Sequence, residues 1–267
     1  MFLAGPEAEN FALVTLSKRG LILARKLSRD LGGQIFAHQD VGPGQGVISF
    51  ERIMDLTADI FSRFRGIVYI APSGVAARCI ARCIEHKGRD PAVVVVDIGG
   101  RWAISLLSGH EGGANALALK TANSLGCEPV ITTTSQALKD IIVGLGCRRG
   151  TAAGDIVQAI NLALNKAGVS LDMVRLLATA DIKKGEAGLI SAAEKLGLSL
   201  YFLSSARIRN MPLGLKESEF VKNMVGLPGV AEPCALLAGK NARLILGKTV
   251  CKGVTIALAR ESFLWLE

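Results

Sequence analysis

The stretch from Ala92 to Asn115 constrains the fold of this 267-residue chain more than any other. It opens with Ala92–Val96, a run of apolar residues without a polar position. A strand with one solvated face alternates apolar and polar residues, whereas a strand covered by helices on both faces is apolar throughout. The run therefore predicts a central strand of an α/β sheet. A hairpin partner at 102–106, turned by Gly99-Gly100, and an amphipathic helix over 114–125 are expected to follow.

The same alternation of strand and helix patterns runs through the whole chain. Further strands are expected at 10–15, 34–37, 66–70, 128–132, 141–145, 175–179, 200–203, 243–246 and 253–259, with helices between many of them. Such an alternation is typical of an α/β fold with a mostly parallel sheet. The polar segment 132–136 is the best boundary candidate. We therefore expect two α/β domains, 1–136 and 137–267, each a mostly parallel sheet flanked by helices.

A polar loop lies between the hairpin partner and the helix at 114–125. The sequence Ser-Leu-Leu-Ser-Gly-His-Glu-Gly-Gly-Ala-Asn at 105–115 supplies three candidate catalytic residues, Ser108, His110 and Glu111, and four candidate substrate-binding residues, Gly109, Gly112, Gly113 and Asn115. Glycines allow tight turns and close approach of a ligand to the backbone, and free amides at a helix start can bind an anion. In the structural alternative, His110 only hydrogen-bonds the turn, Ser108 only caps it, and Asn115 only ties loop backbone together.

Three further turns carry candidate binding residues. The small-residue turn after the strand at 66–70 contributes Ser73 and Gly74; the glycine-bracketed turn after 141–145 contributes Gly146, Arg148, Arg149 and Gly150; and Glu232 lies at the start of a helix. Two guanidinium groups beside free helix amides suit a carboxylate or a phosphate. The alternatives are a solvated turn for the arginines and a helix cap for Glu232. We expect the loops at the carboxyl ends of the parallel strands to form a cationic pocket beside His110.

Composition indicates a globular protein whose basic charge suits an acidic small-molecule ligand or, as the alternative, a merely solubilising surface. Half of the residues are apolar, 20% are charged and the net charge is +8, but no basic run exceeds two residues and aromatic residues make up only 5%. Nucleic-acid binders usually gather basic charge into a stripe with stacking aromatics. No apolar run approaches the roughly 18 residues that a membrane span needs, and the first residues do not resemble a secretory signal. We expect a cytoplasmic protein that binds neither nucleic acid nor membrane.

The cysteines do not predict a metal site. Six cysteines are scattered along the chain, and in a cytoplasmic protein they are expected to be reduced core residues. Cys79 and Cys83 share a helix face and could hold a soft metal, but no matching pair of ligands follows at metal-site spacing.

The motifs at 105–115, Gly144-Leu-Gly-Cys-Arg-Arg-Gly150, Glu232-Pro-Cys-Ala235 and Gly253-Val-Thr255 resemble the cobalt-precorrin-5A hydrolase family of anaerobic cobalamin biosynthesis. The resemblance spans nearly the whole chain. Here, however, the two domains follow one another almost directly, whereas family members typically carry a central segment. Glu111 also stands where leucine is more usual in that family, and Gly185-Glu186 where Asp-Glu is expected.

The resemblance implies a reaction on an anionic corrinoid. A hydrolase of this family opens the δ-lactone of cobalt-precorrin-5A and releases a two-carbon unit as acetaldehyde, giving cobalt-precorrin-5B. No cofactor is implied, because the substrate carries its own cobalt. The implied partners are the corrinoid itself and, as a further possibility, neighbouring enzymes of the pathway.

Lactone opening needs an activated water and donors for the developing oxyanion. We assign the general base to His110 and the oxyanion donors to the amides of Gly112 and Gly113, with Glu111 orienting His110 or facing solvent. Ser108 lacks the Gly-x-Ser-x-Gly surroundings of a nucleophile elbow. Two other classes stay open: a non-catalytic protein that binds or hands over corrinoids, and a nucleotide-binding enzyme, for which the glycine-rich phosphate motif is missing.

Overall fold

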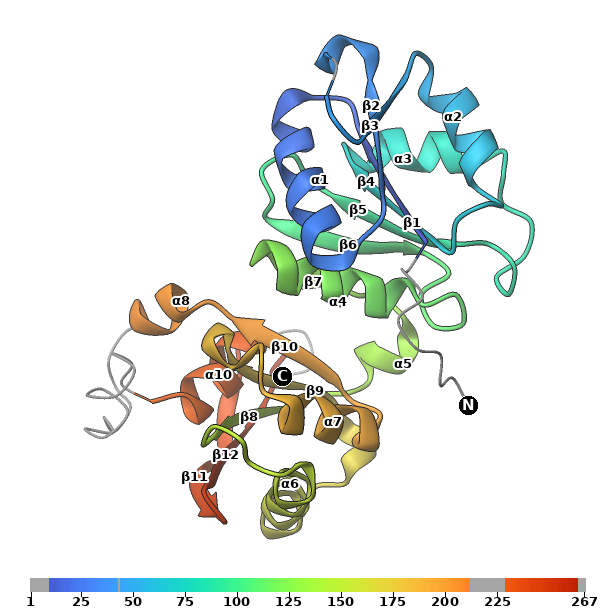
Figure 1. Cartoon of the computed structure of the whole chain (residues 1–267). Coiled ribbons are helices and arrows are strands. Elements are labelled where there is room, and N and C mark those ends of the chain that lie inside the picture. Colours follow the sequence, from blue (N-terminus) through green and yellow to red (C-terminus); the bar gives the residue numbers. More distant parts are fainter. Residues whose placement is uncertain (1–9, 43, 212–228, 264–267) are drawn as a thin grey trace. The chain divides into compact units, whose positions relative to one another are not determined.

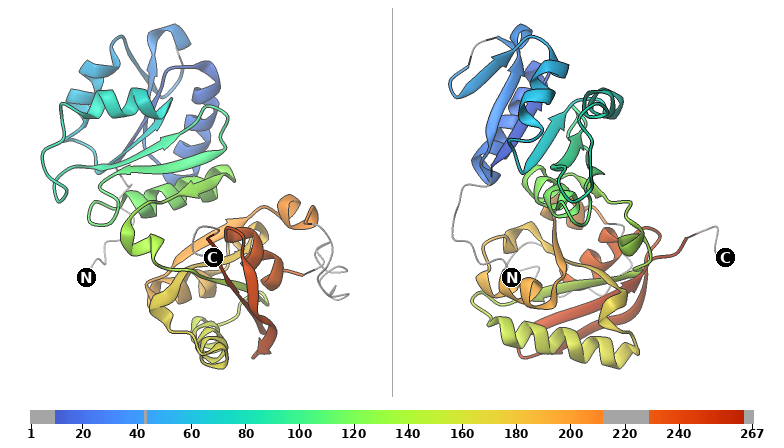
Figure 2. Two further views of the ribbon diagram at one scale, coloured as in Figure 1. Left: turned by 180° about the vertical axis from the view of Figure 1, so that it is seen from behind. Right: turned by 90° about the vertical axis from the view of Figure 1, so that its right-hand side faces the viewer.

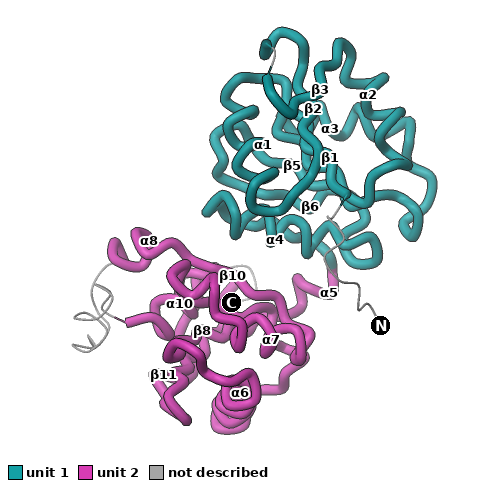
Figure 3. The backbone as a smooth tube through the Cα atoms, viewed as in Figure 1, with its two compact units in different colours: residues 1–133 teal, residues 134–267 magenta. Residues whose placement is uncertain are grey.

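The computed structural model describes residues 10–42, 44–211 and 229–263, and the chain forms two compact units, Met1–Thr133 and Thr134–Glu267 (Figure 3). The expected boundary lay between Gln136 and Ala137, close to the observed division. The first residues, on which the expectation about a secretory signal rests, lie outside the described ranges. Within those ranges, no helix combines the length and the apolar character that crossing a bilayer requires.

Unit 1 is built around a sheet of seven strands in the order β3-β2-β1-β4-β5-β6-β7 (Figure 1). Its elements are β1 (Phe11–Thr15), α1 (Lys18–Leu31), β2 (Gln34–His38), β3 (Val47–Phe50), α2 (Ile53–Ile60), β4 (Gly66–Ile70), α3 (Ser73–Ile80), β5 (Ala92–Val96), β6 (Trp102–Leu107), α4 (Ala114–Leu125) and β7 (Glu128–Val130). All neighbouring strands are parallel except β5 and β6. The central strands β1, β4 and β5 are buried along their whole length, as the apolar run in β5 predicts.

Helices cover both faces of this sheet (Figure 2). Helices α2 and α3 bury Ile60 and Ile80 against one face, in a core cluster that also includes Tyr69 of β4 and Phe64. Helices α1 and α4 pack against the other face. The edge strand β3, in which two of the four residues are exposed, was not predicted.

The antiparallel strand β6 decides where the loops of unit 1 lie. Val96 pairs with Ala103 and Val93 with Leu107, so β6 ends beside the start of β5. Strands β1 to β5 end at one edge of the sheet, which we call the carboxyl edge. The loop after β6 therefore lies at the opposite edge, which we call the amino edge. A five-residue strand separates the two edges by roughly 16 Å.

Unit 2 has a sheet of five strands in the order β10-β9-β8-β12-β11. Its elements are α5 (Thr134–Ala137), β8 (Ile141–Cys147), α6 (Ala153–Ala167), β9 (Val174–Ala180), α7 (Ala187–Leu196), β10 (Ser199–Leu203), α8 (Ser205–Arg209), α10 (Ala231–Ala238), β11 (Arg243–Cys251) and β12 (Val254–Arg260). Strands β8, β9 and β10 are parallel, whereas β12 and β11 join them antiparallel. The expected α/β class is confirmed, although the sheet of unit 2 is parallel in only half of its pairings.

Helices α6 and α7 pack on one face of the second sheet and α10 on the other. The contact between α10 and β8 depends on Gly144. A Cβ at this position would lie 1.9 Å from the carbonyl oxygen of Ala231 and 2.6 Å from the backbone nitrogen of Ala235. Only glycine therefore allows the helix to approach the strand this closely.

Candidate functional site

The loop 108–113 in unit 1 closes on itself before α4 begins. The amide of Ala114 donates to the carbonyl oxygen of Ser108 at 3.1 Å, and the amide of Asn115 donates to that of Gly109 at 2.9 Å. These amides are therefore not available to an external anion, contrary to the expectation of a free helix start. Among the described residues, the amides of Gly112 and Gly113 have no acceptor, so these two stay available as donors.

Backbone geometry fixes the shape of this loop. Ser108 has φ 58°, in the left-handed region where a residue with a Cβ is strained by about 1–2 kcal/mol. A Cβ on Gly112 would lie 2.4 Å from the Cβ of Ser108, so this position requires glycine. Gly113, with φ 88°, is left-handed as well. The serine and the glycines thus hold one tight conformation.

Asn115 ties the loop to the rest of unit 1. Ser105 Oγ donates to Asn115 Oδ1 at 2.8 Å, and Asn115 Nδ2 donates to Thr133 Oγ1 at 3.0 Å. A Cβ on Gly109 would come within 2.7 Å of the Thr133 methyl group. The observed contacts therefore match the structural alternative for Asn115, in which this side chain holds the loop in place.

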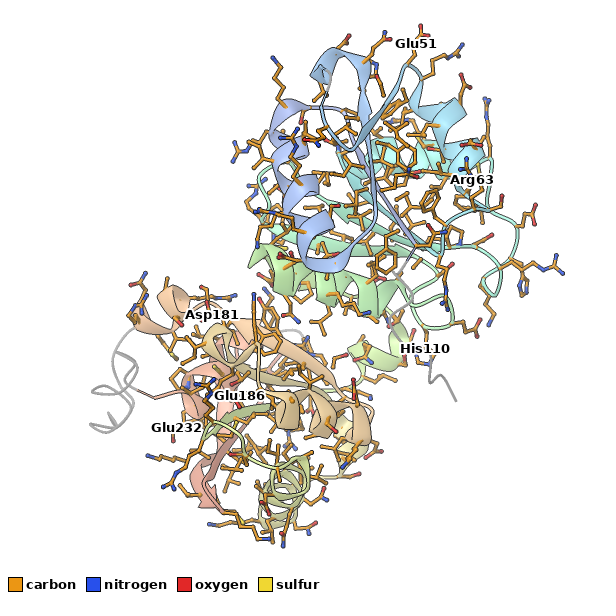
Figure 4. The ribbon with its side chains drawn as sticks, viewed as in Figure 1. Glu51, Arg63, His110, Asp181, Glu186 and Glu232 are labelled. Atoms are coloured by element: carbon orange, nitrogen blue, oxygen red, sulfur yellow. The ribbon has the colours of Figure 1, made fainter. Side chains whose placement is uncertain are left out.

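His110 and Glu111 are exposed at the tip of the loop, and Figure 4 shows His110 at the periphery of unit 1. Glu111 forms an ion pair with Lys87 at 2.9 Å, which joins this loop to the loop before β5. The hydrogen bond and the charge of Lys87 hold the pKa of Glu111 below its ordinary value. Glu111 is thus an anion next to the exposed imidazole of His110.

The hydroxyl of Ser108 is enclosed and has no hydrogen-bond partner among the described residues. It makes no hydrogen bond to His110, so the structure does not pair these residues as nucleophile and base. A second enclosed, unpartnered oxygen lies on Asp90, which is only 6% exposed. Its other carboxylate oxygen accepts the amides of Glu85 and His86. Sequence reasoning did not select Asp90, because nothing in the sequence indicates that it is buried.

Ser73 and Gly74 do not join the loop 108–113. They begin α3, directly after β4, and therefore lie at the carboxyl edge of the sheet. The expectation that His110 shares one pocket with these residues is wrong within unit 1. The physical reason is the direction of β6, which carries the loop of His110 to the amino edge.

In unit 2, the turn 146–150, which we call the arginine turn, lies at the carboxyl end of β8. Arg148, Arg149 and Gly150 are exposed, and Gly146 is half-buried within the strand. The amide of Gly150 donates to Glu186 Oε2 at 3.0 Å, and Lys183 Nζ lies 3.4 Å from Glu186 Oε1. This turn therefore binds a carboxylate, and that carboxylate belongs to the chain itself.

The carboxylate of Glu186 is stabilised as an anion. The hydrogen bond from Gly150 and the charges of Lys183 and Arg149 outweigh burial and hold its pKa below the ordinary 4.5. Glu186 follows β9, the neighbour of β8, so the shared carboxyl edge brings the two turns together. The signal in the sequence was the polar turn 181–186 directly after a strand, but the pairing of its residues was not predictable. Figure 4 labels Glu186 and Asp181, which begins the same turn.

Glu232 lies in the first turn of α10 but does not cap it. Its Oε1 accepts the amide of Lys248 in β11 at 2.8 Å. The alternative of a helix cap is therefore wrong, and the side chain instead satisfies an amide where the register of β11 is irregular. Among the described residues, no three His, Cys, Asp or Glu side chains are grouped as metal ligands would be.

Comparison with known proteins extends over both units. The family model described as Cobalamin synthesis G N-terminal matches residues 55–136, and the one described as Cobalamin synthesis G C-terminus matches residues 141–259. Protein CobE of a Sinorhizobium species is 35% identical over 136 residues, which cover 50% of this chain and 88% of CobE. The chain belongs to the cobalamin synthesis G family. A role in cobalamin biosynthesis follows.

Two further relatives are named cobalt-precorrin-5A hydrolase. The Priestia megaterium protein is 25% identical over an alignment 359 positions long, which covers 94% of each chain. This aligned length exceeds the 267 residues of our chain, so the relative carries segments that our chain lacks. The Salmonella typhimurium protein is 40% identical over 128 residues, which cover 48% of this chain but only 36% of that protein.

Proposed function

We propose that this protein is a hydrolase that opens the δ-lactone of cobalt-precorrin-5A and yields cobalt-precorrin-5B and acetaldehyde. The observation that carries the proposal is the match of both family models, one in each unit, together with relatives that bear this name. The loop of His110 in unit 1 and the arginine turn in unit 2 supply residue types that suit such a substrate.

The chemistry requires water to attack the lactone carbonyl. His110 takes the proton of that water as its oxygen bonds to the carbonyl carbon, since an imidazole can act as a base near neutral pH. The amides of Gly112 and Gly113 donate to the oxyanion that forms. The carbon–oxygen bond of the ring then breaks, which leaves a carboxylate and a hydroxyl group. The hydroxyl group then loses its proton to solvent as the carbon–carbon bond beside it breaks, which forms the carbonyl of acetaldehyde. The electron pair of the broken bond stays on the macrocycle.

The acidic side chains of the corrinoid need cationic partners. Arg148 and Arg149 are exposed, and the same turn already binds the carboxylate of Glu186. A guanidinium group matches a carboxylate in geometry and charge. In this proposal, a carboxylate of the substrate binds the arginine turn beside Glu186 or displaces it. The cobalt ion belongs to the substrate, and the proposal gives the protein no cofactor of its own.

The test is an acetaldehyde assay with purified protein and cobalt-precorrin-5A. We expect acetaldehyde in stoichiometric amounts, and His110→Ala should lower the turnover rate at least ~100-fold if His110 is the base. The control is His38→Asn, because the side-chain oxygen of asparagine can still accept the amide of Asp40 as the imidazole does. Unchanged turnover in His110→Ala contradicts the role of His110. Tight binding of the corrinoid without acetaldehyde contradicts the reaction and favours a handover protein.

A further inference from the structure

A cleft of about 560 Å³ opens at the carboxyl edge of unit 1. Its walls come from the segments that follow three neighbouring strands, β1, β4 and β5. The lining residues are Arg19, Pro72, Asp97, Ile98, Gly99 and Arg101. In a doubly wound sheet, ligands bind at this edge where the strand order reverses direction. Here the reversal lies between β1 and β4, directly below the cleft.

The charges in the cleft favour an anion. Arg19 is exposed and has no ion pair or side-chain hydrogen bond within the described ranges. Asp97 is an anion whose oxygens already accept the amides of Gly99, Arg101 and Trp102. Together with Arg19 and Arg101 it leaves one net positive charge in the cleft. The remaining contact of Asp97 is an ion pair at 3.0 Å with Nε of Arg101. The other guanidinium nitrogens of Arg101 lie on a side chain that is 66% exposed.

Two large apolar side chains lie near these cations: Ile98 lines the cleft, and Trp102 contacts Arg101. Ile98 is 47% exposed and Trp102 is 40% exposed, although both are large hydrophobic residues. The guanidinium group of Arg101 lies 4.3 Å from the centre of the Trp102 ring, which fixes the side chain in place. Exposed apolar groups beside two cations, of which Arg101 is held by Asp97 and Trp102, suit a ligand with a flat apolar body and an anionic rim.

The turn between β1 and α1 argues against a nucleotide. It contains only Leu16 and Ser17, and Ser17 Oγ already accepts the amide of Gly20 at 3.1 Å. A Cβ on Gly20 would lie 2.0 Å from Thr15 Oγ1, so this glycine serves the packing of α1 on β1. A diphosphate is typically bound by a glycine-rich loop at this point, and this two-residue turn contains no glycine.

We propose that the cleft is a docking site for a flat polycarboxylate macrocycle, held by Arg19 and Arg101 with its apolar face against Ile98 and Trp102. The ligand class rests on the proposed function, whereas the cleft and its charges do not. The site is separate from the loop of His110, which lies at the opposite edge of the same sheet.

The test uses uroporphyrin I, a tetrapyrrole polycarboxylate, in isothermal titration calorimetry with the full chain. The variant Arg19→Gln/Arg101→Gln should weaken binding at least ~10-fold, since it removes two charge-assisted contacts. The control Arg52→Gln/Arg63→Gln removes the same net charge from exposed arginines of another part of unit 1, and binding should stay within about twofold. Circular dichroism melts verify that both variants fold.

Two further probes separate the parts of the proposal. Citrate offers carboxylates without a flat body, so Ile98→Ser should weaken the binding of uroporphyrin I and leave that of citrate unchanged. ADP tests the nucleotide alternative. Equal losses in the two double variants, or binding of ADP but not uroporphyrin I through Arg19 and Arg101, would overturn the proposal. The acetaldehyde assay is independent of these titrations, so a failure of one proposal does not imply a failure of the other.

Discussion

Replacing Gly188 by alanine should destabilise unit 2 and disturb its arginine turn. Gly188 is the second residue of α7. A Cβ on it would lie 2.0 Å from the carbonyl oxygen of Thr151 and 3.4 Å from the backbone nitrogen of Ala153. These are backbone atoms of the turn that follows Arg148 and Arg149, so no side-chain rotation can relieve the clash.

The size of the effect follows from this geometry. Cβ contacts below 3.0 Å do not occur in real structures, so α7 and the turn must separate by at least 1 Å from the 2.0 Å position. Overpacking of this kind costs about 1–3 kcal/mol, which lowers Tm by about 4–12 °C in a unit of this size. Gly185 is the matched control. It has no neighbour within 4 Å of a built Cβ and its φ is not positive, so Gly185→Ala should stabilise unit 2 by about 0.4–1 kcal/mol.

Differential scanning calorimetry of both variants measures the stability, and an NMR titration of Glu186 measures the turn. In Gly188→Ala the bond between the amide of Gly150 and Glu186 should weaken, so the pKa of Glu186 should rise toward its ordinary value. If Gly188→Ala and Gly185→Ala have the same Tm, or if Glu186 titrates unchanged in Gly188→Ala, α7 does not depend on this close contact and the reasoning is refuted.

Three other predictions concern single side chains. Because the pKa of Glu186 is lowered, its contribution to stability is present above its ordinary pKa and is lost as the pH falls through the lowered value. In urea unfolding, the free energies of the wild type and of Glu186→Gln should therefore differ at pH 7 and converge in acid. A difference that stays constant with pH would contradict this. Asp90→Ala should lower the free energy of unfolding by about 1–2 kcal/mol in the same assay, since two amides lose their acceptor, and Asp90→Asn should cost less. Iodoacetamide should modify Cys83 but not the buried Cys127 and Cys234. Burial raises the pKa of both buried thiols, that of Cys127 to about 12. Mass spectrometry of the native protein measures which cysteines react.

Local patterns predicted the elements of this fold well. The apolar run Ala92–Val96 gave a buried central strand, and Gly99-Gly100 gave the turn of an antiparallel hairpin. The limit lay in the placement of the loops. The predicted hairpin already implies that β6 runs antiparallel to β5, so that its loop lies at the edge where β5 begins. The expected pocket nevertheless grouped His110 with the loops at the carboxyl ends of the parallel strands.

The contacts within the candidate site could not be predicted in this way. Lys87 and Glu111 are 24 positions apart, and Gly150 and Glu186 are 36 positions apart. Spacing along a helix or strand carries no information at such separations, and only packing decides which charged group meets which amide. The arginine turn was recognisable as a carboxylate site from its composition. The sequence did not predict that Glu186 supplies the carboxylate that this turn binds.

One ring bound to unit 1 cannot contact both edges of its sheet at the same time. The buried strands β4 and β5 lie between the cleft at one edge and the loop of His110 at the other. A rigid ring held by Arg19 and Arg101 cannot present its lactone to the imidazole of the same chain, since the core of the unit separates them. His110→Ala should consequently slow turnover while uroporphyrin I keeps its affinity for the cleft. Equal weakening of uroporphyrin I by His110→Ala and by the double arginine variant would mean that one ring reaches both edges, and the separation inferred from the direction of β6 would be wrong.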